Sequence, residues 1–138
     1  MKKTIFALLL VAVMALPAGC GWWGGHSAAV GQEFTLGVGD KVTIRGEGLS
    51  VVFADVIEDS RCPTGVLCIW EGRVRCSVLL TRGGSTYTET FTQQGLSAEP
   101  ATESALGYQF SFKVTPYPEA GKEIAMKDYR LAITVTIP

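Results

Sequence analysis

The cysteines offer the clearest chemistry in this sequence. Cys62 and Cys68 are separated by five residues that include a proline and a glycine, so this segment can turn back and close a small disulfide ring. Cys76 is the competing partner, but it lies eight residues beyond Cys68, roughly 26 Å of extended chain. That pairing would need a sharp reversal at Glu71-Gly72. We therefore expect a Cys62–Cys68 disulfide and a buried, inert thiol at Cys76, with a bridge to Cys76 as the alternative.

Metal and catalytic sites have weaker support. A zinc site built from the three cysteines would lack the C-x₂₋₄-C spacing of zinc ligands, and the only histidine, His26, lies in a predicted tether. The chain contains no G-x-S-x-G nucleophile elbow and no C-x-x-C redox motif. The acidic residues between positions 55 and 59 are interpreted as a solvated strand end or as partners of Arg61 and Arg73, with a calcium site as the competing interpretation. We predict a protein that is not an enzyme, with no catalytic residues, no metal site and no cofactor.

The size and charge of the chain limit its class. With 138 residues, of which 47% are hydrophobic and 18% charged, it can build one hydrophobic core but hardly two. The formal net charge of −1 leaves no basic excess to neutralise phosphates. These values argue against a multidomain enzyme and against nucleic acid as a partner.

The N-terminus has the three-part pattern of an export signal. Lys2 and Lys3 precede an apolar run at 5–16, and Pro17-Ala18-Gly19-Cys20 follows. The apolar run is shorter than the roughly 20 residues that a membrane-spanning helix needs. We expect cleavage after residue 19 and export into an oxidising compartment, where disulfides persist.

The residues around the expected cleavage site resemble the lipobox of bacterial lipoproteins, in which small residues precede a cysteine. The resemblance implies that Cys20 receives a diacylglyceryl group and anchors the mature chain to a membrane. The alternative is an ordinary signal peptide whose product is released. Residues 20–30 are glycine-rich and are expected to form a lipidated, flexible tether, in which Trp22 and Trp23 would favour the headgroup zone. The expected location is the bacterial cell envelope, at the outer membrane or the extracytoplasmic face of the cell membrane.

Beyond the tether, apolar residues alternate with polar ones, which is the pattern of half-buried strands. The alternation predicts seven short strands and no long helix, at about 34–38, 42–44, 49–57, 74–80, 87–91, 108–114 and 131–137. The first two strands flank Gly39-Asp40 and are expected to form a hairpin. Residues 31–138 therefore predict a single all-β domain, an antiparallel β-sandwich or a closely related small barrel. The long connections 94–106 and 116–128 are the expected binding loops.

One segment carries a family resemblance. Residues 59–72 read DSRCP, four further residues, a second Cys, Ile-Trp, one residue and Gly. This pattern resembles a signature of small secreted or lipidated bacterial proteins of uncharacterised function. The resemblance implies a disulfide turn that leads into a core strand, with Trp70 buried as a core aromatic over the bridge, and it implies no activity. The alternative is that Trp70 is an exposed ligand-stacking residue, with Glu71, Arg73 and Arg75 beside it as a polar rim.

Two functions are consistent with these features. The first is a lipid-anchored binding or structural module of the cell envelope, whose partner is an envelope protein or a glycan. The second is an envelope-anchored inhibitor of a hydrolase, such as a protease or a lysozyme.

Overall fold

The computed structural model describes residues 26–96 and 99–138. The predicted signal peptide 1–19, the predicted lipidation site Cys20 and the tryptophans Trp22 and Trp23 lie outside these ranges. Within the described ranges, no helix is both long and apolar enough to cross a bilayer.

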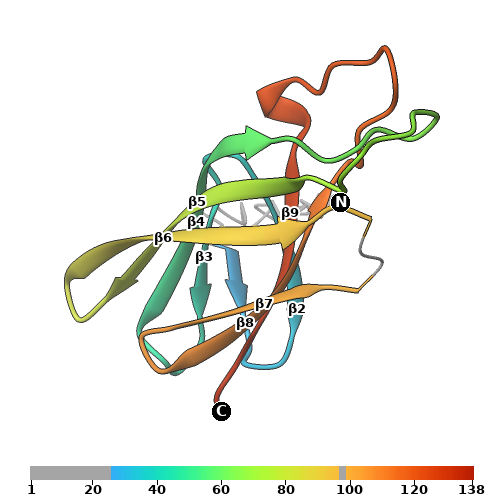
Figure 1. Ribbon diagram of the computed structural model, residues 1–138. Helices are drawn as coiled ribbons and strands as arrows, with labels where there is room; N and C mark the ends of the chain where they lie inside the picture. The colour runs from blue at the N-terminus through green and yellow to red at the C-terminus, as the bar shows by residue number, and fades with distance from the viewer. Residues whose placement is uncertain (1–25, 97–98) are drawn as a thin grey trace, which may run out of the picture.

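The described residues form two β-sheets that pack face to face (Figure 1). One sheet has the strand order β1-β3-β4-β5-β6 and the other β2-β9-β8-β7. Neighbouring strands are antiparallel except for β1 and β3, which are parallel. The predicted all-β sandwich is thus confirmed. The strands are β1 (His26–Ala28), β2 (Glu33–Gly37), β3 (Lys41–Ile44), β4 (Leu49–Asp59), β5 (Arg73–Arg82), β6 (Ser85–Gln94), β7 (Ala101–Ala105), β8 (Tyr108–Thr115) and β9 (Arg130–Thr136), and a short 3₁₀ helix spans Met126–Asp128.

The core lies between the sheets and is filled by the inward face of each strand. In β5 and β8 every second residue is buried, because successive side chains of a strand point to opposite faces. Phe91 of β6 meets two rings of the other sheet, with centroid distances of 5.2 Å to Phe110 and 4.9 Å to Phe112. These aromatic contacts join the two sheets.

The predicted hairpin between the first two strands is wrong. A tight turn does form, with Asp40 accepting a hydrogen bond from the Gly37 N–H at 2.8 Å. However, β2 pairs with β9 and β3 pairs with β4, so this turn carries the chain from one sheet to the other. Leu36 and Val42 are both buried and enter the core from opposite sheets. Alternation within each strand cannot distinguish this crossing from a hairpin.

Two strands of the structure, β1 and β7, were not predicted from the sequence. Residues 26–28 were expected in the tether, yet they form β1 on the edge of a sheet, with Ala28 buried. The domain therefore begins by residue 26 and not at residue 31. The predicted loop 94–106 contains β7, which pairs with β8. Both strands are short and built from small and polar residues, so they lack a readable apolar alternation.

Two loops project together from one end of the sandwich (Figure 1). The first, residues 60–72, joins β4 to β5 and contains Cys62 and Cys68; we call it the disulfide loop. The second, residues 116–125, follows β8. The C-terminus lies at the opposite end of the sandwich, which Figure 1 shows at the bottom.

Candidate functional site

Cys62 and Cys68 form the predicted disulfide, with their Cα atoms 5.9 Å apart. Cys76 is fully buried on the inward face of β5 and is not bridged, so the alternative pairing is excluded. Burial raises the pKa of the Cys76 thiol to about 12. A thiol with so high a pKa is an inert part of the core, as predicted.

Exposed apolar side chains gather on the disulfide loop. Leu67 and Ile69 are fully exposed, and Val66 and Trp70 are about half exposed. Leu96, which follows β6, lies on the same open hollow, whose volume is about 600 Å³. We call this set the apolar loop surface; it consists of Val66, Leu67, Ile69, Trp70 and Leu96.

The expected core position of Trp70 is wrong, because 59% of this residue is exposed. The strand β5 begins only at Arg73, so Trp70 belongs to the part of the disulfide loop that projects past the sheets. Trp70 lies outside the core cluster that the described residues form. The space between the sheets is filled instead by the rings of Phe91, Phe110 and Phe112.

A buried arginine fixes the start of the disulfide loop. Arg61 is only 4% exposed, and its Nε and Nη2 donate to the two carboxylate oxygens of Asp59 at 2.8 and 2.6 Å. Its Nη1 donates to the Val114 carbonyl at 3.1 Å, and Nη2 donates to the Pro116 carbonyl at 3.0 Å. The guanidinium therefore ties the end of β4 to the end of β8 in the opposite sheet. A planar fork of donors suits this arrangement, and lysine has none.

Asp59 is the acceptor at the centre of this network. It also accepts a hydrogen bond from the Tyr129 hydroxyl at 2.9 Å. Burial alone would raise the pKa of Asp59, but the hydrogen bonds and charge of Arg61 and the bond from Tyr129 outweigh it and hold the pKa below its ordinary value. Burial and the hydrogen bond to Asp59 raise the pKa of Tyr129 to about 12. The network is thus an anionic carboxylate held by neutral and cationic donors.

A second acidic residue of this strand end, Glu58, is also paired with arginines. Glu58 lies 3.5 Å from both Arg73 and Arg75, and its carboxylate accepts a hydrogen bond from Ser60. These contacts confirm, for Asp59 and Glu58, the interpretation of the acidic residues as partners of Arg61 and Arg73.

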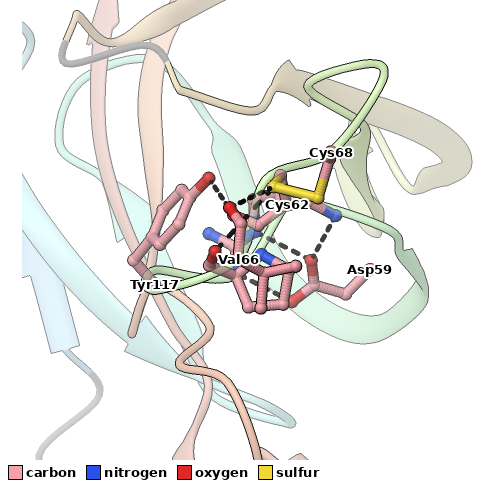
Figure 2. Close-up of a disulfide and its surroundings, with 7 residues drawn as sticks. Asp59, Cys62, Val66, Cys68 and Tyr117 are labelled. Atoms are coloured by element: carbon pink, nitrogen blue, oxygen red, sulfur yellow. Dashed lines mark hydrogen bonds and ion pairs between the residues drawn. A yellow bond between two sulfur atoms is a disulfide. The ribbon is translucent and has the colours of Figure 1, made fainter.

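The 116–125 loop supports the disulfide loop from the side. The Tyr117 hydroxyl donates to the Cys62 carbonyl at 2.7 Å, next to the bridge (Figure 2). The Thr64 N–H donates to the Pro118 carbonyl at 3.0 Å, and the Ala120 N–H donates to the Thr64 carbonyl at 3.2 Å. Backbone pairing, the disulfide and the Arg61 network together restrain the disulfide loop.

Close backbone packing explains the glycine at the end of the signature. Gly72 has a φ of +70°, and a Cβ at this position would lie 1.8 Å from the Ser60 carbonyl oxygen. The Cys62 N–H donates to the Glu71 carbonyl at 3.0 Å, so the two stems of the loop are in direct contact. Only glycine fits here without a backbone shift.

The sequence predicted neither the exposed aliphatic residues beside Trp70 nor the buried polar residues Arg61 and Gln93. Residues 66–70 form an apolar run without a period of two, and this run sits in a segment with turn residues; that combination was the available signal for an exposed loop. Gln93 is 4% exposed, and its Oε1 accepts a hydrogen bond from the Val114 N–H at 2.9 Å. Its role depends on the neighbouring sheet, which no local pattern reveals.

Comparisons of this chain with models of protein families, with curated proteins and with solved structures found no match.

Proposed function

We propose that this protein is a lipoprotein of the bacterial cell envelope whose β-sandwich is a binding module, with the apolar loop surface as its binding face. The observation that carries the proposal is the exposure of Leu67, Ile69 and Trp70 on a loop closed by a disulfide. Burial of each such side chain would contribute about 1.5 to 3 kcal/mol to folding. The fold forgoes that contribution, so stability of the isolated domain does not account for these residues.

The rigidity of the disulfide loop supports a binding role. A loop already held in one conformation loses little entropy when it binds, which improves affinity. Here the Cys62–Cys68 bridge, the Arg61 network and the Tyr117 hydrogen bond hold the loop. We assign no enzymatic activity to this face.

The chemistry of the face favours an apolar partner over a glycan. Residues 63–70 include no charged side chain, and Thr64 has the only side-chain hydroxyl among them. Glycan recognition needs several polar groups around an aromatic ring, whereas this face has aliphatic side chains around Trp70. The sequence analysis expected binding at the loops 94–106 and 116–128, but most residues of the proposed face belong to the disulfide loop. The expected loops contribute only Leu96 and Tyr117 to the lining of the hollow.

The proposed anchor gives the first prediction. Replacing Cys20 with Ser should abolish incorporation of labelled fatty acid and move the protein from the membrane fraction to the soluble fraction. The thioether is expected to provide most of the membrane affinity, since stable attachment rests on acyl chains. The measurement is metabolic labelling followed by fractionation of the expressing bacteria.

A serine at position 68 is a matched control, because it also removes one cysteine but leaves the proposed lipidation site intact. It should keep the fatty-acid label. If the Cys20→Ser chain is still labelled, or the unaltered chain takes up no label, the lipoprotein proposal is wrong.

A second candidate function is inhibition of an envelope or host hydrolase. The rigid disulfide loop favours it, because inhibitors that occupy an active-site cleft present a pre-organised loop. Incubating the protein with a panel of lysozymes and cysteine proteases distinguishes the two functions. Inhibition that is lost in Leu67→Ser would favour this second candidate.

A further inference from the structure

The N-terminal segment joins the sandwich on the side that faces the disulfide loop. His26 of β1 pairs with Val42 of β3, which pairs with Val51 of β4. From Val51, β4 runs toward the disulfide loop and ends at Asp59, whereas the parallel strands β1 and β3 run away from it. Residues preceding His26 therefore connect to the end of β1 that is nearer to the disulfide loop.

The number of residues between Cys20 and His26 limits how far the N-terminal end of β1 can lie from a membrane that holds Cys20. Six residue steps separate Cys20 from His26, which allows at most roughly 20 Å. The disulfide loop begins after Asp59, eight residues beyond Val51, and so projects up to about 26 Å further in the same direction. The projection of the loop is thus comparable with the reach of the tether. A domain anchored through Cys20 can therefore rest its disulfide loop on the membrane surface.

The chemistry of the loop matches a bilayer interface. Leu67 and Ile69 are fully exposed aliphatic side chains, and Trp70 stands beside them with 59% exposure. Tryptophan favours the headgroup zone, and aliphatic side chains favour the acyl chains below it. We propose that the apolar loop surface docks onto the lipid bilayer that holds the anchor, so that the disulfide loop is a second membrane contact and fixes the orientation of the sandwich. This inference rests on the proposed lipidation of Cys20.

The charged residues nearby indicate that this docking is apolar and not electrostatic. On the adjacent 116–125 loop, Glu119 and Lys122 form an ion pair with each other. Residues 63–70 have no charged side chain, and Glu71 follows them. No cationic cluster in this loop pair would attract anionic lipids. Docking should therefore occur on zwitterionic lipid and should be insensitive to salt.

A shortened chain tests the docking separately from the anchor. Every core residue lies between Ala28 and Val135, so a chain of residues 24–138 contains the whole described sandwich. It lacks Cys20 and two of the three tryptophans, which leaves Trp70 as the sole indole. We expect this chain to bind phosphatidylcholine vesicles reversibly at high lipid concentration, too weakly to keep an unanchored chain in a membrane fraction. Its tryptophan emission should shift to shorter wavelengths, at low and at high salt alike.

Variants at the two ends of the domain provide the comparison. Leu67→Ser combined with Ile69→Ser should lower the partition coefficient at least about tenfold, because it removes the inserted aliphatic side chains. Both residues are fully exposed, so folding should be unaffected. Ile137→Ser is the matched control, since Ile137 is an exposed aliphatic residue at the opposite end. It should bind vesicles like the unaltered chain.

Several results would overturn the inference. They are absence of vesicle binding by the unaltered chain, equal binding of the double variant and Ile137→Ser, or an emission shift that arises from self-association without vesicles. Capture of a protein through residues 67 and 69 in the absence of vesicle binding would assign the surface to a protein partner instead. None of these results affects the fatty-acid labelling of Cys20. The vesicle experiment therefore tests the docking inference independently of the lipoprotein proposal.

Discussion

Replacing Arg61 with Ala is expected to lower the free energy of unfolding by about 3 to 5 kcal/mol, the cost of leaving a buried charge without its partner. Asp59 would lose both hydrogen bonds to the guanidinium, and the carbonyls of Val114 and Pro116 would lose their donor. Since a domain of this size has only about 5 to 15 kcal/mol of stability, the variant should unfold at much lower urea. The measurement is equilibrium denaturation of residues 24–138.

Arg75→Ala is the matched control for this variant. Arg75 also pairs with a carboxylate, at 3.5 Å from Glu58, but its side chain is 36% exposed. An exposed pair of this kind contributes at most about 1 kcal/mol. Equal denaturation midpoints for Arg61→Ala and Arg75→Ala would show that Arg61 does not hold the sheets together.

The same network makes stability depend on pH. Because the folded state lowers the pKa of Asp59 from 3.8, the network contributes fully above that value. The contribution is lost as the pH falls through the lower pKa of the folded state. The Arg61→Ala variant should lack this part of the acid destabilisation, since the donor that lowers the pKa is gone.

Replacing Gly72 with Ala is expected to lower the free energy of unfolding by about 2 to 5 kcal/mol. One part is the left-handed backbone, which is unfavourable for a residue with a Cβ, and the other is the displacement of a packed neighbour. The added methyl would lie 1.8 Å from the Ser60 carbonyl oxygen, so the two stems of the disulfide loop must separate. Thermal unfolding measures the effect.

Gly121→Ala separates the two contributions. Gly121 has a similar φ of +74°, but a Cβ there meets no atom within 4 Å. Gly121→Ala should lower the free energy of unfolding only through its left-handed backbone, by about 1 to 2 kcal/mol. Equal melting temperatures for Gly72→Ala and Gly121→Ala would show that the close contact between the two stems of the disulfide loop adds nothing to the effect of the Gly72 substitution.

The parts of the fold that follow from local patterns could be predicted from the sequence. Alternation along β5, β8 and β9 located their buried faces, because the two-residue period of a strand is a property of the chain itself. The spacing of Cys62 and Cys68 predicted the bridge in the same way, since ring closure depends on the residues between them.

The errors concern contacts that only the folded chain creates. Whether the turn at Gly39 joins strands of one sheet or of two depends on the distant partner β9. The family resemblance implied that Trp70 packs in the core, but the core is filled by residues of other strands. Arg61 can be buried because Asp59, the Val114 carbonyl of β8 and the Pro116 carbonyl just after β8 accept its hydrogen bonds.

Photo-crosslinking from the disulfide loop tests the proposed binding face most directly. A diazirine amino acid is placed at position 67 of the full chain and, as the control, at position 137 at the other end of the sandwich, and the bacteria are irradiated. We expect adducts with envelope lipid from position 67 and far fewer from position 137. Equal yields from the two positions, or water as the sole reactant at position 67, would contradict the assignment of the apolar loop surface as the binding face.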